Sequence, residues 1–210
     1  MSTKMLIDHL VVSGESLQDA CSYIEESLGV QMQDGGKHAL FGTHNKLLGL
    51  NDGLYLECIA IDPVVPRPTH TRWFNLDNFS GQPRLTNWVC NCEKLEQELV
   101  KIPIDVGHIM DVKRAELNWR ITVPQNGILP FDGLFPALIE WSSVKIHPAK
   151  TLESSGCFLK HLTICHPAGD QMELHLGDLR DERVSFEVHD CAGLCAEFVN
   201  SSGKVCLLEC

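Results

Sequence analysis

The chain has 210 residues, of which 44% are apolar and 21% are charged, proportions typical of a soluble globular protein. Its formal net charge of −11 argues against a nucleic-acid partner or an anionic membrane surface, and no apolar run reaches the length of a membrane span. The ten cysteines follow an N-terminus without the basic and apolar regions of a secretory signal, so we expect free thiols in a reducing cytoplasm.

The first quarter of the chain predicts one strand, one helix and then further strands. Residues 5–12, MLIDHLVV, form an apolar run typical of a buried strand. Apolar residues then recur at helical spacing between Ser16, which suits an N-cap, and Gly29, which suits a C-cap. Residues 38–50 predict one or two strands, and an Asn-Asp-Gly turn leads into another strand at 54–61. The predicted order of this unit is β-α-β-β-β.

The same order returns twice, more weakly the second time. In the second unit we expect a strand at 83–92, a helix at 92–102, and strands at 116–124 and 135–143. In the third we expect a strand at 157–167, a short helix at 170–179, and strands at 184–190, 193–200 and 203–210. A repeated supersecondary unit is an architectural signal and predicts an α+β fold. The predicted boundaries are modules at 1–62, 83–147 and 148–210, the last one partial, and a linker at 63–82.

Charged and amide side chains interrupt apolar strands at matched positions. Side-chain alternation places His9 on one face of the first strand and Asp8 on the other. Glu57 lies in the last strand of the first unit, and Glu140 has the equivalent position in the second unit. In the first strand of the second unit, Asn87 occupies the position equivalent to His9. A buried carboxylate needs a paired charge or a metal. His9 is either a core histidine with a hydrogen-bond partner or a ligand that points into a cavity.

One imidazole and two carboxylates on strands of one sheet would suit a divalent metal. Fe(II), Mn(II), Ni(II) and Zn(II) all accept such ligands and leave positions open for a substrate. The third unit repeats the pattern with His161 in its first strand and Glu209 in its last strand. This repetition in equivalent places favours a functional interpretation of the polar residues.

Other polar residues allow two interpretations each. His44 and Asn45, in the sequence GTHN, belong either to a pocket or to a turn. Alternation places Trp119 on one face of its strand and Arg120 on the other, where Arg120 would bind a ligand carboxylate or, the favoured interpretation, form a salt bridge to a glutamate. In the linker, residues 72–74 predict a packed crossover rather than a lid.

A series of motifs resembles the glyoxalase-like branch of the vicinal oxygen chelate superfamily. The motifs are DHLVV, GTHNKLL followed by YLECIAIDP, RWF, WRITVP followed by DG, and P-LIEW-S followed by HPA. The resemblance extends from Met5 to His166 and more weakly to the end of the chain. It implies paired β-α-β-β-β modules that build a cup-shaped, mixed sheet, commonly with a divalent metal in the cup.

Carried over position by position, the resemblance implies metal ligands at His9, Glu57 and Glu140. Asn87 occupies a fourth position, where the superfamily usually has His, Gln or Glu. Glu57 or Glu140 would act as a ligand or as the general base. The predicted substrate pocket consists of His44, Asn45, Asn87, Trp119 and Arg120.

Three functional hypotheses follow. The first is a metal-dependent lyase, isomerase or dioxygenase that acts on a small oxygen-rich molecule in the cup. The second is a binding or sequestration protein of the same fold, favoured by Asn87 and by tryptophans that could line a pocket for a flat ligand. The third makes the C-terminal unit a dimerisation element and predicts a homodimer.

Overall fold

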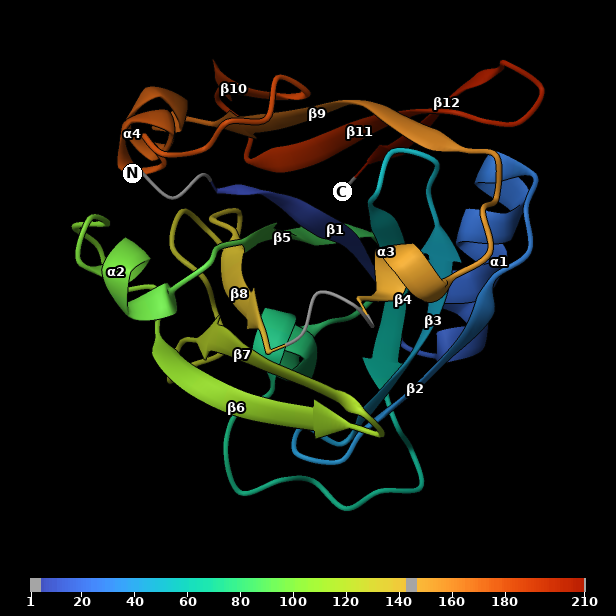
Figure 1. The fold of residues 1–210 in the computed structure, drawn as a ribbon, viewed down its shortest axis with the longest axis horizontal. Helices are drawn as coiled ribbons and strands as arrows, with labels where there is room; N and C mark the ends of the chain where they lie inside the picture. The colour runs from blue at the N-terminus through green and yellow to red at the C-terminus, as the bar shows by residue number, and fades with distance from the viewer. Residues whose placement is uncertain (1–4, 143–146, 210) are drawn as a thin grey trace.

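The computed structural model describes residues 5–142 and 147–209 and folds them into two β-sheets flanked by short helices (Figure 1). The larger sheet has eight strands in the order β2-β3-β4-β1-β5-β8-β7-β6, and the smaller has four in the order β10-β9-β11-β12. Strands therefore dominate, and the predicted α+β class is confirmed. No helix of the described residues is long and apolar enough to cross a membrane.

The first half of the large sheet has the predicted β-α-β-β-β order. Its helix begins where the Ser16 side chain accepts a hydrogen bond from the backbone N–H of Asp19, and it ends at Gly29, whose left-handed conformation suits glycine. One apolar stripe of the helix is buried: Ala20, Cys21, Ile24 and Leu28. The elements are β1 (Leu6–Ser13), α1 (Leu17–Leu28), β2 (Gln33–His38), β3 (Thr43–Gly49) and β4 (Tyr55–Ile61).

The second half repeats this order. Its elements are β5 (Arg84–Asn91), α2 (Leu95–Leu99), β6 (His108–Arg114), β7 (Leu117–Val123) and β8 (Ala137–Trp141). The sequence analysis missed β6 because this edge strand buries only Val112 and shows no apolar alternation. The omission matters because β6 ends at Arg114, which enters the candidate site.

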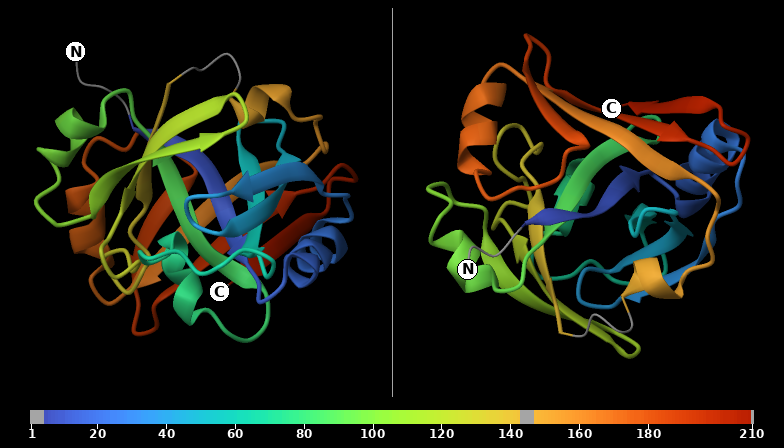
Figure 2. Two further views of the ribbon diagram at one scale, coloured as in Figure 1. Left: turned by 90° about the horizontal axis from the view of Figure 1, so that it is seen from below. Right: turned by 45° about the horizontal axis from the view of Figure 1, so that its top comes forward.

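The two halves meet at the centre of the sheet. β1 pairs in parallel with β4 and antiparallel with β5, and β5 in turn pairs in parallel with β8. The sheet curls into a cup whose edge strands β2 and β6 approach each other (Figures 1 and 2). A Cβ atom on Gly36 of β2 would lie only 2.7 Å from Cδ of Arg114, which shows how close the two edges are. Both halves therefore contribute to one interior.

The C-terminal unit forms a separate layer. Its elements are β9 (Phe158–His166), α4 (Gly169–His175), β10 (Val184–Val188), β11 (Gly193–Val199) and β12 (Val205–Glu209), so the predicted element order is confirmed. The strand pairing differs, however. In the first unit the first strand, β1, is parallel to the last strand, β4, whereas in the C-terminal unit the first strand, β9, is parallel to β10, the strand that follows the helix. This sheet lies across β1 and β5 (Figure 1). The rings of Trp88 and Phe186 meet between the two layers, with centroids 6.3 Å apart. A short helix, α3 (Pro148–Thr151), precedes it, and residues 143–146 of the predicted second module lie outside the described residues.

The connection between the two halves is a packed crossover, as predicted. Arg72 is 3% exposed, and its Nε donates a hydrogen bond to the backbone oxygen of Phe41. Its Nη1 lies 2.6 Å from Asp77 Oδ1. The following 3-10 helix η1 (Trp73–Asn78) has Phe74 and Asn75 at φ 55° and 53°, a costly left-handed conformation. These contacts hold Trp73 and Phe74 against the cup.

Replacing Arg72 by Ala is expected to lower the free energy of unfolding by about 2–3 kcal/mol, because Asp77 would lose its buried partner. Urea denaturation measures this change. Arg67→Ala is the matched control, since Arg67 lies 3.5 Å from the same carboxylate with a 74% exposed side chain, and should cost less than about 1 kcal/mol. Equal effects of the two variants would show that the crossover is not anchored by Arg72.

Candidate functional site

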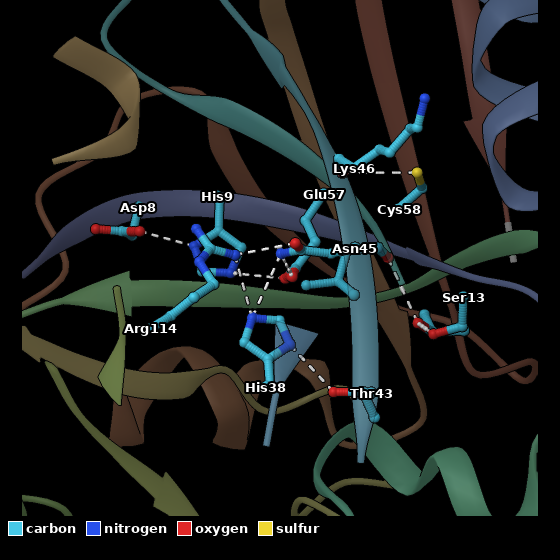
Figure 3. Close-up of polar contacts among 12 residues, drawn as sticks. Asp8, His9, Ser13, His38, Thr43, Asn45, Lys46, Glu57, Cys58 and Arg114 are labelled. Carbon is cyan, nitrogen blue, oxygen red and sulfur yellow. Dashed lines mark hydrogen bonds and ion pairs between the residues drawn. The ribbon is translucent and has the colours of Figure 1, made fainter. Parts of the chain in front are cut away.

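A small polar pocket lies inside the cup between its two halves. Its walls come from β1, β2, β3, β4 and η1 on one side and from the end of β6, β7 and β8 on the other. Polar groups gather at its centre (Figure 3), and aromatic rings surround them. The lining residues are His9, His38, Asn45, Leu47, Tyr55, Glu57, Trp73, Phe74, Arg114, Trp119, Ile121, Ile139 and Trp141.

A β-bulge sets the position of Asp8. The pairing of β1 with β5 shifts between Ile7 and His9, so Asp8 is an extra residue on β1. Its carboxylate is buried and lies 2.7 Å from Nδ1 of His9, and it also accepts hydrogen bonds from three further side chains. These donors are Nδ2 of Asn91, Nε1 of Trp141 and Nε2 of His147. Simple alternation, which separated Asp8 from His9, was therefore wrong at this strand.

His9 connects Asp8 to Glu57. Its Nε2 lies 3.5 Å from Glu57 Oε2, and its ring stacks on Tyr55 with centroids 4.4 Å apart. Burial opposes a charge on His9, but the hydrogen bonds to both carboxylates and their charges outweigh it and raise the pKa of His9 to about 9. Burial likewise opposes the charge on Glu57, yet His9 and the amide of Asn45 lower the pKa of Glu57. The pocket therefore holds an imidazolium between two carboxylates.

Arg114 and His38 complete the polar centre from opposite edges of the sheet. Nη1 of Arg114 lies 3.2 Å from Nε2 of His38 and 2.9 Å from Oδ1 of Asn45. Because a guanidinium only donates, Nε2 of His38 is an acceptor and Nδ1 carries the proton, which it donates to Thr43 Oγ1. Burial lowers the pKa of His38 to about 4, so this ring is neutral. A neutral acceptor and a fixed cation thus face the same space (Figure 3).

One buried donor belongs to a residue that lines the pocket and has no partner among the described residues. Nε1 of Trp73 is buried and makes no hydrogen bond with the described residues. A buried N–H without an acceptor is costly, and a bound oxygen atom would satisfy it. The side chains leave about 20 Å³ of space for the centre of a water molecule, which suits one or two waters or a small polar group.

The pH dependence of stability should report the charge on His9. Because the folded pKa of about 9 exceeds the usual 6.5, the stabilisation is complete below pH 6.5 and is lost as the pH rises through 9. We expect the free energy of unfolding to fall by about 3 kcal/mol over this range. Urea denaturation at pH 6 and at pH 9.5 measures it. His9→Gln should remove most of the difference, and an unchanged slope in that variant would contradict the assignment.

Four of the predicted site residues line this pocket, namely His9, Asn45, Glu57 and Trp119. Glu140 and Arg120 do not, because they alternate with the pocket residues of β8 and β7 and so lie on the opposite face of the sheet. There Arg120 Nη2 lies 2.5 Å from Glu140 Oε2, which confirms the salt-bridge interpretation. Glu140 Oε2 also accepts a hydrogen bond from the backbone of Leu95.

The remaining two predicted residues lie outside the pocket as well. His44 alternates with Asn45 on β3, is half-buried, and is absent from the lining. Asn87 donates to the backbone oxygen of Gly133 and lines a neighbouring, more open pocket, which shares Phe74 with the first. Neither residue therefore faces His9 and Glu57.

The sequence analysis missed Asp8, His38 and Arg114 as site residues. A signal for one of them, Arg114, is the glycine pair at 35–36. A Cβ atom on Gly35 would collide with Asn45 and one on Gly36 with Arg114, so glycines there allow these side chains to meet. The bulge that moves Asp8 has no comparable signal in a single sequence.

The pocket residues do not form the predicted metal site. His9 and Glu57 face each other, but the third predicted ligand, Glu140, lies across the sheet. Among the described residues, no group of three or more His, Cys, Asp or Glu side chains is placed to hold a metal ion. Arg114 instead supplies the positive charge beside Asn45 and His38. The arrangement therefore does not fit Fe, Mn, Ni or Zn bound by the predicted set.

A curled sheet of two β-α-β-β-β halves around a polar pocket defines a protein with the vicinal oxygen chelate fold. The chain belongs to the glyoxalase-like domain family of this superfamily, whose sequence profile matches residues 7–179. The family resemblance is thereby confirmed. A search of curated proteins finds no match.

Solved structures share the fold at low sequence identity. A hypothetical protein from Staphylococcus aureus is 14% identical, with 98% of this chain and 84% of that chain aligned and a TM-score of 0.59. Methylmalonyl-CoA epimerase from Mycobacterium tuberculosis is also 14% identical, with 65% of this chain and 88% of that chain aligned and a TM-score of 0.46. The first of these similarities supports the fold of the whole chain, including the C-terminal layer.

Proposed function

We propose that the chain is a proton-transfer enzyme, an isomerase or a lyase, that acts on a small oxygen-rich substrate in the cup. The proposal depends on the Glu57 carboxylate. It is shielded from bulk solvent, its pKa is lowered so that it is ionised, and it lines the pocket. Its pKa is lowered against the effect of burial, so it is ionised at neutral pH, which is the form that a general base needs. Asn45 and His9 hold its two oxygens in place.

The other polar groups suit the charge that such a reaction develops. When a base removes a proton from carbon beside a carbonyl or carboxyl group, negative charge moves to oxygen. Arg114 and the unpartnered N–H of Trp73 are donors for that oxygen. The imidazolium of His9, oriented by Asp8, keeps Glu57 ionised before the transfer and can return a proton afterwards. Glu57 is therefore the proposed base, and His9 the proposed acid.

A substrate larger than a few atoms would need more space than the inner pocket leaves. The neighbouring open pocket offers this space, and it adjoins the inner pocket because Phe74 lines both. We place the reacting end of the substrate at Glu57 and Arg114, and the remainder beyond Phe74, where Asn87 and Thr86 offer polar contacts. In this arrangement Asn87 keeps a part in substrate binding, as the sequence predicted, away from the reacting atoms.

Solvent exchange tests the proposal even while the substrate is unidentified. The purified protein is incubated in D₂O with small dicarbonyls, 2-hydroxy acids and 2-oxo acids, and NMR follows deuterium entering at carbon. We expect exchange of at least one compound, and we expect it to persist after chelator treatment. Elemental analysis of the same sample, prepared without a metal-binding tag, measures bound metal.

Two other outcomes would reject the proposal. Exchange that stops on chelation and returns with one metal ion per chain would favour the metal-dependent hypothesis. Binding detected by thermal shift, with no chemical change in any compound, would favour the binding or sequestration protein.

A further inference from the structure

Two thiols from different elements meet on the outer side of the cup. Sγ of Cys21 on α1 and Sγ of Cys58 on β4 are 2.8 Å apart. Both residues are buried, with exposures of 4% and 0%. Cys58 is next to Glu57 in sequence, but its side chain points to the opposite face of β4, away from the pocket (Figure 3). The pair is therefore separate from the site described above.

Cys21 is also within reach of a small oxidant. It lines a surface depression together with Gln18, Glu25 and Lys46. The hydrogen bond with Cys58 lowers the pKa of Cys21, and the Lys46 cation lowers it further against the opposing effect of burial. The pKa of Cys58 is raised by the same contact. One thiol is thus the better nucleophile, and the other stands beside it as a resolving thiol.

We propose that Cys21 and Cys58 form a redox modification site that a hydroperoxide converts to an intramolecular disulfide. The Cys21 thiolate attacks the peroxide, takes up one oxygen as a sulfenic acid, and releases water or an alcohol. The Cys58 thiol then attacks the Cys21 sulfur, an S–S bond forms, and the hydroxyl leaves as water. Two thiols are oxidised and one peroxide is reduced, and the new bond links α1 to β4.

The sequence allows a direct test by mass spectrometry. Cleavage after Lys and Arg, except before Pro as at Arg67, places Cys21 in residues 5–37 and Cys58 in residues 47–72, each with a single cysteine. The full-length protein is treated with hydrogen peroxide, alkylated and digested without reductant. We expect a linked pair of these two peptides that separates on reduction. Two free peptides after treatment, or a link from either one to another cysteine, would overturn the proposal.

Single variants assign the two roles. In Cys58→Ser the sulfenic acid on Cys21 has no resolving thiol, so dimedone should label residues 5–37. In Cys21→Ser, Cys58 should remain unlabelled because it is fully buried, and burial alone still raises its pKa. Cys90→Ser is the matched control: Cys90 is equally buried, and its loss should leave the peroxide-induced link intact. Labelling of Cys58 rather than Cys21 would reverse the roles and reject the proposed order.

Thermal unfolding gives a second measurement that does not depend on digestion. The oxidised wild type should melt roughly 5–10 °C above the reduced protein, since the bond constrains the unfolded chain. Cys58→Ser should show no such difference. An oxidised wild type that forms the link but melts at or below the reduced protein would show that the bond distorts the native fold, which would overturn the proposal.

Discussion

Replacing Glu57 by Gln is expected to lower the rate of deuterium exchange by roughly 10²- to 10⁴-fold, the usual contribution of a general base. The amide has nearly the same shape, and its oxygen can still accept the hydrogen bond from Asn45. Its NH₂ group then faces Nε2 of His9, and the side chain cannot accept the substrate proton. NMR measurement of exchange with the compound identified for the wild type gives the ratio. The folded state of the variant is checked by its melting temperature.

Glu140→Gln is the matched control because the sequence alone makes the two glutamates equivalent. Glu140 lies on the other face of the sheet, paired with Arg120, so its substitution should leave the exchange rate within about twofold. A large loss in Glu140→Gln, or full activity in Glu57→Gln, would contradict the proposed base. The pair of variants thus separates the structural assignment from the one based on sequence.

Replacing Asp8 by Asn is expected to lower the free energy of unfolding by about 3–5 kcal/mol, because a buried charge network would lose its central acceptor. The Asp8 carboxylate accepts from four side chains, and His9 and His147 hold its pKa well below the usual range despite burial. The Asn amide offers one acceptor oxygen, and its NH₂ group would face the N–H donors that now bind the carboxylate. Urea denaturation at pH 7 measures the loss.

Asp34→Asn provides the comparison for Asp8→Asn. The Asp34 side chain is 98% exposed and lies 3.5 Å from Lys46, so its substitution should change stability by less than about 1 kcal/mol. The pH dependence assigned to His9 should also weaken in Asp8→Asn, since one of its two carboxylate partners is gone. A small loss of stability together with an unchanged pH profile would show that Asp8 does not orient His9.

Much of the fold could be predicted from the sequence because local patterns report it directly. Apolar periodicity and the caps Ser16 and Gly29 predicted the first helix, and the apolar run at residues 5–12 predicted the first strand. The edge strand β6 was missed, since it carries almost no buried side chains. The pairing of the C-terminal strands was also beyond reach, because element order does not determine which strands become neighbours.

The candidate site was predicted only in part, for two physical reasons. Alternation correctly separated Trp119 from Arg120, but the same rule failed at Asp8, where a bulge adds one residue. Glu57 and Glu140 have equivalent positions in the sequence but not in the structure, because their side chains point to opposite faces of the sheet. Arg114 reaches the pocket only because the curled sheet brings its two edges together, which is a property of the whole fold.

The central position of β1 has a consequence for synthesis on the ribosome. Seven of its eight residues are buried, yet both neighbouring strands are translated later, β4 from Tyr55 and β5 from Arg84 to Asn91. At 5–20 residues per second, roughly 4 to 16 seconds pass between the emergence of β1 and the completion of β5. During this interval the nascent chain presents an apolar strand with an open edge, which is the kind of segment that chaperones bind and that aggregates. The yield of folded protein should therefore depend on elongation rate and chaperone supply more than the stability of the finished cup suggests.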